Sequence, residues 1–247
     1  MKLGICGFSG RMGLNICRLA INKGHTISAA FDHNSSPSYN TNAHVFDQRV
    51  DENVIITDIN EQDIKNSDGI IDFSAPEATV ELLHIAQETS TPIVIGTTGF
   101  SENEAATIEV ASKNIPILFS PNMSLGVNFL FKLTEYATKA LAENFDIEVF
   151  EAHHKYKKDS PSGTAKKLLS IIQESADSLK DAELLHGREG MYAERKKDEI
   201  GVFAMRGGDI VGDHTIFYAG TGERIEITHR LTNRDPLASG AIVGMEF

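Results

Sequence analysis

The segment from Glu148 to Lys166 is the part of the chain richest in side chains that can do chemistry. The protein as a whole is acidic, with a formal net charge of -12. Yet five lysines and two histidines lie between His153 and Lys167, beside a single acid, Asp159. A local excess of positive charge on an acidic chain predicts a site for a small anion. Titratable donors beside such a site predict proton transfer to the bound anion.

Two features of this segment bear on its chemistry. The run Pro161-Ser162-Gly163-Thr164 stands where a helix would begin, and the N–H groups of a helix N-terminus suit a carboxylate or phosphate. His153 and His154 are adjacent at the end of a predicted strand, so their side chains should point to opposite faces. That geometry is poor for binding one metal ion together, and zinc-like spacing of other ligands is missing, so we expect no metal.

Either residue type in the segment can serve as a general acid. Histidine titrates near neutrality, and neighbouring cations can lower the pKa of a lysine. The alternative for the three lysines nearest the histidines is a solvated, charged loop. We favour that interpretation for Lys155 and Lys158, whereas spacing alone leaves Lys157 undecided.

A second site is predicted at the N-terminus, where Gly7-Phe8-Ser9-Gly10-Arg11-Met12-Gly13 follows an apolar run. This is Gly-x-x-Gly-x-x-Gly, a variant of the dinucleotide-binding pattern. Its glycines permit a tight turn and a close approach to a pyrophosphate, and the following helix offers its N-terminal dipole. Asp32 ends the next predicted strand, where an acid binds the adenosine ribose hydroxyls. The alternatives are a plain glycine turn and an ordinary turn aspartate.

Small and polar residues also follow the later predicted strands. Asp72-Phe73-Ser74 ends one strand, Gly96-Thr97-Thr98-Gly99-Phe100 follows the next, and Ser120-Pro121-Asn122-Met123 follows the last. Ligands of open α/β sheets bind beyond the carboxyl ends of the strands, so these residues fit a nicotinamide pocket. The alternative is that Gly96 and Gly99 only shape a loop.

Two different architectures are needed to position these two sites. In the first 120 residues, short apolar runs alternate with amphipathic stretches, which predicts a Rossmann-like doubly wound parallel sheet. The predicted strands are 3–6, 27–31, 54–57, 69–73, 93–95 and 117–119, and the predicted helices are 11–23, 77–89 and 102–113.

Past residue 124 the pattern changes, because strand-like runs follow one another without intervening helices. This predicts a separate α+β domain with an open mixed or antiparallel sheet. Its predicted helices are 125–143 and 163–179, and its predicted strands are 146–152, 200–206, 209–218 and 223–231. A short helix is expected over 237–247.

Bulk properties agree with a small-molecule enzyme. With 247 residues, 41% of them hydrophobic, the chain can form two modest domains. Its acidity, with a pI of about 5.2, argues against nucleic acid or a membrane surface as partner. Only Cys6 and Cys17 are present, so a disulfide framework is not expected. The chain shows no signal-peptide pattern or membrane span, so we expect a cytoplasmic protein.

Taken together, four motifs closely resemble those of the 4-hydroxy-tetrahydrodipicolinate reductase (dihydrodipicolinate reductase) family. They are Gly7-x-x-Gly-Arg-Met-Gly13, Gly96-Thr-Thr-Gly-Phe100, Asn122-Met-Ser-Leu-Gly-Val-Asn128 and Glu151-Ala-His-His-x-x-Lys-x-Asp-x-Pro-Ser-Gly-Thr164. Their order and spacing match nearly the whole chain, including residues 206–215 and 223–229. The histidine–lysine motif is highly specific, whereas the glycine motif is shared with many dehydrogenases.

The resemblance implies a reductase of the diaminopimelate–lysine pathway that uses NADH or NADPH to reduce a cyclic imine-type dicarboxylate. It implies that His153 is the general acid/base and Lys157 the proton donor. The implied substrate-binding residues are His154, Ser162, Gly163 and Thr164. The implied cofactor-binding residues are Gly7, Phe8, Ser9, Gly10, Arg11, Met12, Asp32, Gly96, Thr97, Thr98, Ser120, Pro121, Asn122 and Met123.

The resemblance also implies a domain organisation and an assembly. Residues 1–124 with 234–247 form the dinucleotide-binding domain, and residues 125–233 form the substrate-binding domain, whose sheet builds a homotetramer. One departure concerns the cofactor: some members carry an arginine after the acid of the second strand, whereas here His33 follows Asp32. Because Asp32 would repel a 2′-phosphate, we expect NADH or dual use over strict NADPH use.

Two other functions remain open at this point. One is an NAD(P)-dependent dehydrogenase that acts on a different small dicarboxylate. The other is a non-catalytic dinucleotide sensor, which the donor-rich segment at 153–164 argues against, because a sensor needs no proton donor.

Overall fold

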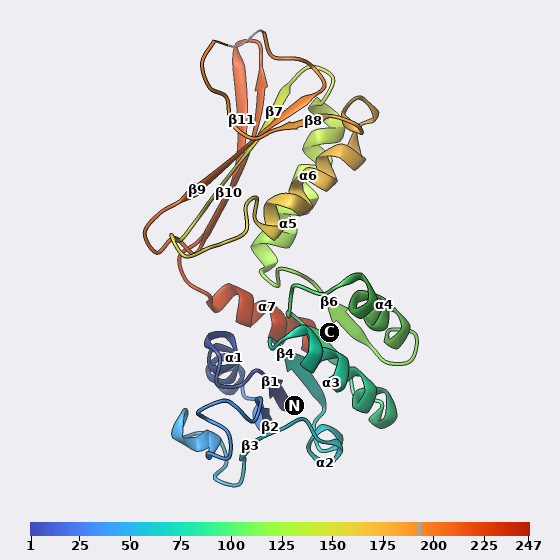
Figure 1. Cartoon of the computed structure of the whole chain (residues 1–247), viewed down its shortest axis with the longest axis vertical. Coiled ribbons are helices and arrows are strands. Elements are labelled where there is room, and N and C mark those ends of the chain that lie inside the picture. Colours follow the sequence, from blue (N-terminus) through green and yellow to red (C-terminus); the bar gives the residue numbers. More distant parts are fainter. Residues whose placement is uncertain (192–193) are drawn as a thin grey trace. The chain divides into compact units, whose positions relative to one another are not determined.

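The computed structural model describes residues 1–191 and 194–247. The chain divides into two compact units (Figure 1), the first made of Met1–Ser124 with Arg234–Phe247 and the second of Leu125–Asn233. Among the described residues, no helix combines the length and the apolar character needed to cross a membrane.

The first unit is built on a six-stranded parallel sheet with the order β3-β2-β1-β4-β5-β6. This is the strand order of a doubly wound dinucleotide-binding fold, with its topological switch point between β1 and β4. The sheet confirms the fold class predicted for this part of the chain. The strands are β1 (Lys2–Cys6), β2 (Thr26–Phe31), β3 (Ile56–Thr57), β4 (Gly69–Asp72), β5 (Ile93–Ile95) and β6 (Ile117–Phe119).

Helices cover both faces of this sheet, and a separate apolar core lies under each face. On one face lie α1 (Arg11–Asn22) and the C-terminal α7 (Asp235–Glu246). On the other lie α2 (Glu61–Lys65), α3 (Pro76–Thr89) and α4 (Glu102–Ala111). The short α2 was not predicted, because five residues are too few to establish a helical period. A 3-10 turn spans Ala43–Val45.

The second unit contains a five-stranded mixed sheet with the order β11-β10-β7-β9-β8, as predicted for an α+β domain. The pairs among β11, β10 and β7 are antiparallel, and those among β7, β9 and β8 are parallel. The strands are β7 (Asp146–His153), β8 (Glu183–Leu185), β9 (Glu199–Arg206), β10 (Gly212–Gly220) and β11 (Glu223–Leu231). The three-residue β8 was not predicted.

Two helices, α5 (Leu125–Leu141) and α6 (Gly163–Ser175), pack on one face of this sheet (Figure 1). The predicted helix 163–179 ends early because Ala176 is extended, and a 3-10 turn over Asp177–Leu179 follows. The predicted strand 209–218 begins instead at Gly212, because the chain turns at Gly208, whose φ is +51°.

Along β7, the buried side chains on the helix-covered face of the sheet change from apolar to polar. Ile147 and Val149 are buried in the apolar core with residues of α5 and α6. The next two side chains on the same face are Glu151 and His153, which are also buried. On β10, Tyr218 and Ile216 give way in the same manner to His214. The apolar core therefore ends in a buried polar cluster at the start of α6.

Candidate functional site

The glycine-rich turn of the first unit has the geometry that its sequence predicts. Gly7 has a φ of +76°, a conformation that favours glycine. The N–H groups of Gly7 and Phe8 both donate to the Phe31 carbonyl, at 2.9 and 3.1 Å, which ties the end of β1 to the end of β2. A Cβ on Gly13 would lie 2.3 Å from the Gly7 carbonyl oxygen, so α1 can approach the turn this closely only because residue 13 is glycine.

A cavity of about 870 Å³ opens at the carboxyl ends of β1, β2 and β4. Four of the predicted cofactor residues line it: Gly7, Ser9, Gly10 and Asp32. The Asp32 carboxylate also accepts a 2.8 Å hydrogen bond from the Ser9 N–H, so it shapes the turn as well as the cavity. This is the place where open α/β sheets bind a dinucleotide.

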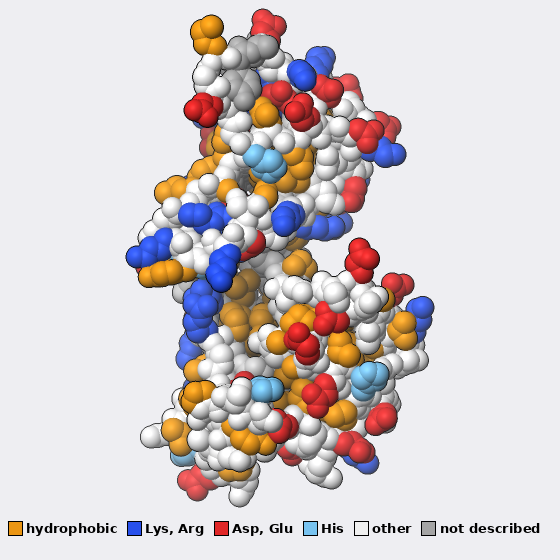
Figure 2. Space-filling view, in the orientation of Figure 1, with side chains coloured by type: hydrophobic (Ala, Val, Ile, Leu, Met, Phe, Trp, Pro, Cys, Tyr) orange, Lys and Arg blue, Asp and Glu red, His pale blue; other side chains and the backbone are white. Residues whose placement is uncertain are grey.

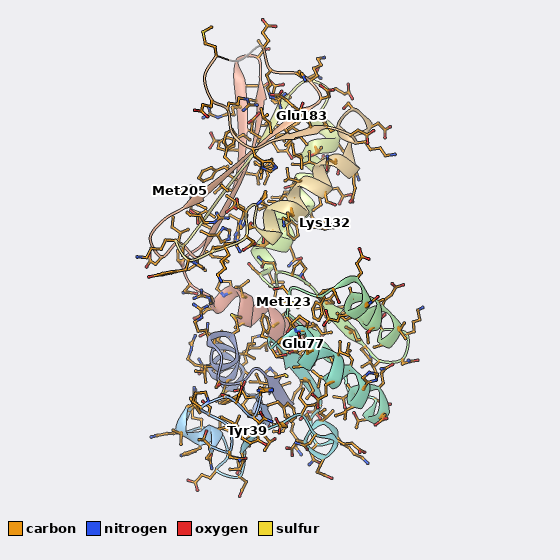
Figure 3. All side chains as sticks on the ribbon, in the orientation of Figure 1. Tyr39, Glu77, Met123, Lys132, Glu183 and Met205 are labelled. Atoms are coloured by element: carbon orange, nitrogen blue, oxygen red, sulfur yellow. The ribbon has the colours of Figure 1, made fainter. Side chains whose placement is uncertain are left out.

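Other predicted cofactor residues are placed differently. Phe8 and Met123 are buried in the apolar core, and Met123 is labelled in Figure 3. Arg11 is exposed at the start of α1, and Met12 packs partly against the core. The loops 96–98 and 120–122 follow β5 and β6, outside the lining of the cavity.

Asp72 fixes the loop after β5. Its buried carboxylate accepts hydrogen bonds from the hydroxyls of Thr79 and Thr97, at 2.6 and 3.0 Å, and from the Ser74 N–H at 3.1 Å. Burial raises the pKa of Asp72, although these hydrogen bonds act in the opposite direction. The hydrogen bond to Asp72 therefore fixes Thr97 against the end of β4. The neighbouring Gly96 packs closely on the Phe73 ring, because a Cβ there would lie 2.2 Å from a ring atom.

In the second unit, the buried polar cluster is organised by Glu151. Its carboxylate accepts two hydrogen bonds from the Arg206 guanidinium, both 2.7 Å long, and one from the Ser162 N–H at 3.1 Å. A fourth contact, of 2.6 Å, joins it to Nδ1 of His153. Burial alone would raise the pKa of Glu151, but the hydrogen bonds from His153, Arg206 and Ser162 outweigh it and lower the pKa to about 2.

His153, the last residue of β7, also contacts a second histidine. The rings of His153 and His214 meet edge to face with centroids 5.2 Å apart. The His214 Nε2 lies 3.1 Å from the Ser162 hydroxyl. Burial, with a smaller contribution from the charge on His153, lowers the pKa of His214 to about 3. His214 is therefore a neutral ring beside His153.

The start of α6 and the basic loop flank this cluster. The Ser162 hydroxyl caps α6 by accepting from the Ala165 N–H at 3.2 Å, and the Ser160-Pro161 peptide bond before it is cis. Gly163 and Thr164 are the first residues of α6, where N–H groups point out of the helix.

The lysines of the loop are placed in two different ways. Lys157 is half-buried and forms a 2.8 Å ion pair with Asp159, whereas Lys155 and Lys158 are exposed. Figure 2 shows Lys and Arg side chains gathered near the lower end of the second unit.

The sequence analysis assigned no individual role to His214 or Arg206, although a signal for both existed. On β7 and β10 the alternating buried positions are apolar until they become Glu151, His153 and His214. A polar residue that continues a buried alternation needs a partner, and Arg206, directly opposite His153 on β9, supplies one. Among the described residues, no group of three His, Cys, Asp or Glu side chains could hold a metal ion.

Comparisons with known proteins agree over both units. The family model for the dihydrodipicolinate reductase N-terminus matches residues 1–123, and that for its C-terminus matches residues 126–247. The 4-hydroxy-tetrahydrodipicolinate reductase of Aquifex aeolicus is 45% identical over 98% of this chain and 91% of its own length. That of Polynucleobacter necessarius is 42% identical over 100% of this chain and 93% of its own length.

Two solved structures share the fold. The dipicolinate-bound dihydrodipicolinate reductase from Paenisporosarcina has a TM-score of 0.77, at 21% identity over 100% of this chain and 93% of that chain. The WlbA dehydrogenase from Thermus thermophilus, in complex with NAD and α-ketoglutarate, has a TM-score of 0.61 at 12% identity, over 99% of this chain and 89% of that chain.

The lowered pKa of His214 predicts how stability depends on pH. The unfolded histidine binds a proton near pH 6.5, while the folded one does so only near pH 3, so the unfolded state binds more protons between these values. We expect the free energy of unfolding to fall as the pH drops from about 6.5, by up to ~1.4 kcal/mol per pH unit for this one proton. Protonation of Glu151 lowers the free energy of unfolding further, but only below about pH 4.5. Urea unfolding measured between about pH 7 and 5 checks this.

The matched variants are His214→Gln, which removes the buried imidazole, and His186→Gln, which removes an exposed one from the same unit. We expect the pH slope to flatten in His214→Gln and to persist in His186→Gln. A wild-type slope in His214→Gln would contradict this account.

Proposed function

The chain belongs to the dihydrodipicolinate reductase family, and from this premise we propose that it reduces 4-hydroxy-tetrahydrodipicolinate to tetrahydrodipicolinate in diaminopimelate and lysine biosynthesis. The two family models together cover nearly the whole chain, and the curated relatives carry this activity in their names. The observation that carries the proposal is the buried His153, bound to Glu151, beside a helix start and a half-buried lysine. The cytoplasmic location stays a prediction.

The arrangement suits the chemistry of this reduction. Loss of the 4-hydroxyl as water gives an electron-poor conjugated imine. Addition of hydride to this imine then leaves negative charge on the ring, which a proton must quench. When bound, a nicotinamide cofactor supplies the hydride. Lys157 donates the proton and His153 acts as general acid/base, while the cationic surroundings stabilise the developing charge.

Binding of the substrate carboxylates is assigned to the start of α6. Ser162 is held by Glu151 and His214, so the N–H groups of Gly163 and Thr164 are presented from a fixed helix end. His154, the residue after β7, supplies a further contact with a substrate carboxylate. A carboxylate fixed in this way orients the ring for proton transfer.

Replacement of Lys157 tests the proton-donor role. We expect Lys157→Ala to lower turnover by about 10²–10⁴-fold, the usual contribution of a general acid, and to leave NADH binding intact. The measurement is NADH oxidation with substrate made freshly from pyruvate and aspartate semialdehyde, together with a fluorescence titration of NADH. Lys158→Ala, which removes an exposed lysine from the same loop, should retain most of the activity. Full turnover in Lys157→Ala would refute the assignment.

For the cofactor, we propose NADH use or dual use in place of strict NADPH use. The cavity of the first unit is lined by the four acids Asp32, Asp58, Glu77 and Glu81. Among the described residues, no lysine or arginine lines it. A 2′-phosphate placed there would meet negative charge, whereas ribose hydroxyls can donate hydrogen bonds to Asp32. Glu77 is labelled in Figure 3.

A charge change beside Asp32 tests this preference. We expect wild-type kcat/KM to be at least as high with NADH as with NADPH. His33→Arg should raise kcat/KM for NADPH roughly ten-fold, because a guanidinium can bind the 2′-phosphate. His84→Arg adds the same charge on α3 outside the cavity and should leave the ratio unchanged. A clear NADPH preference of the wild type would overturn the proposal.

We also propose that the protein assembles as a homotetramer through the second sheet. The face of this sheet opposite α5 and α6 carries apolar side chains, including the half-buried Phe150 and Phe203 and the exposed Met205 (labelled in Figure 3). A sheet face of this kind is typical of a surface that a second subunit covers.

Assembly can be measured by light scattering. We expect a mass near four times that of one chain, and we expect Met205→Glu to reduce it, because a carboxylate would be buried in the interface. Val110→Glu places the same charge at an exposed apolar position on α4 and should leave the mass unchanged. A monomeric wild type would contradict the proposed assembly.

A further inference from the structure

Glu151 has a role that neither its burial nor its ion pair alone explains. We propose that Glu151 is a positioning residue that sets the ring tautomer of His153 and binds that ring to the start of α6. The inference rests on the proposed reductase function for its effect on turnover. Its effect on the ring of His153 is independent of which substrate the protein reduces.

The tautomer follows from the four contacts of the carboxylate. Oε1 accepts from Arg206 Nη2 and from the Ser162 N–H, and Oε2 accepts from Arg206 Nη1. His153 Nδ1 lies 2.6 Å from the same Oε2. A pKa of about 2 keeps Glu151 ionised, and an ionised carboxylate can only accept hydrogen bonds. Nδ1 therefore carries a proton, and in the neutral ring Nε2 carries the lone pair.

The glycine at position 212 avoids a tight contact with the other ring nitrogen of His153, Nε2. A Cβ added to Gly212 would lie 3.1 Å from Nε2. His214, the neighbouring ring, meets His153 edge to face and makes its own hydrogen-bonding contact with Ser162. With Nδ1 protonated and bound to Glu151, Nε2 is the nitrogen of the neutral His153 ring that can accept a proton from a ligand.

The same carboxylate ties this nitrogen to the other elements of the site. Through the Ser162 N–H it holds the cap residue of α6, and the Ser162 hydroxyl in turn accepts from Ala165. Through Arg206, which also donates to the Asp159 carbonyl at 2.7 Å, it holds the residue that pairs with Lys157. A shift of Glu151 would move the proton-handling groups and the helix start relative to each other.

Replacement of Glu151 by glutamine separates positioning from simple space filling. The glutamine side chain has nearly the same shape as glutamate but one acceptor oxygen and one amide that donates. If the oxygen serves Ser162 and Arg206, the amide faces His153 Nδ1, which must then become the acceptor. The neutral ring is thereby forced into the opposite tautomer, with its proton on Nε2.

The experiment compares the full-length wild type with Glu151→Gln, each labelled with ¹⁵N-histidine. The imidazole nitrogens are observed by NMR at rising pH until their signals stop shifting, and the spectrum of His153→Gln assigns His153 among the nine histidines. We expect a protonated Nδ1 in the wild type and a protonated Nε2 in Glu151→Gln. We further expect kcat to fall about 10²-fold, with a smaller change in KM and unchanged NADH affinity.

Glu148→Gln is the matched control. Glu148 lies on the same strand, is also bound by arginines (Arg188 and Arg195), and faces away from His153. The Glu148→Gln variant should keep the wild-type tautomer of His153 and the wild-type kcat when the two proteins are compared at the same state of assembly. Glu151→Gln leaves Arg206 without its counter-charge, which can prevent folding. If the single variant does not fold, the double variant Glu151→Gln/Arg206→Met takes its place in the experiment. The same inverted tautomer and reduced kcat are expected.

Three results would overturn the proposal: an unchanged tautomer in the folded glutamine variants, an inverted tautomer with wild-type kcat, or a loss of kcat of equal size in Glu148→Gln. Failure of the proposed function is distinguishable, because it shows as a wild type that does not reduce the lysine-pathway substrate. The NMR comparison then still decides whether Glu151 sets the tautomer of His153.

Discussion

The buried carboxylate of Glu151 is the constraint on which the second unit's site depends. Removal of a carboxylate from water is costly unless its oxygens are fully bonded. Here a guanidinium, a backbone N–H and an imidazole supply the donors, and they come from β9, from the residue before α6 and from β7 itself. Satisfying one buried charge therefore fixes three elements at once. The residues proposed for proton transfer and for carboxylate binding are attached to those elements.

The first unit uses a buried carboxylate in a related way with a different electrostatic result. Asp72 ends β4 and is bonded by hydroxyls and a backbone N–H from α3 and from the loops after β4 and β5. No cation contributes to these hydrogen bonds, and burial raises its pKa, whereas Arg206 and His153 lower that of Glu151. A buried carboxylate that is bonded by neutral donors suits a structural role, here the connection of α3 to the loops after β4 and β5. The paired carboxylate of Glu151 stays ionised, so it can dictate where a neighbouring ring holds its proton.

Much of the architecture could be predicted from the sequence, because it rests on short-range periodicity. Apolar runs that alternate with helical patterns predicted the parallel sheet of the first unit, and consecutive strand-like runs predicted the mixed sheet of the second. The prediction was weakest where elements are short, as for α2 and β8, or where a single backbone angle ends an element, as at Ala176. The residue types in the loop at 153–164 also indicated an anion site and proton chemistry without knowledge of the fold.

The sequence by itself determined which residues are chemically able to act, since the identities of His153, Lys157 and the glycines of the first turn are local facts. Only the tertiary structure decided which of them are held and by what. Glu151 meets Arg206 across 55 residues, and Ser162 meets His214 across 52. No local pattern encodes such pairs, because they form only when strand register brings β7, β9 and β10 together. The register places the Glu151 carboxylate at the end of an apolar core. Because an unpaired buried charge is strongly destabilising, the fold is stable only with donors placed around this carboxylate.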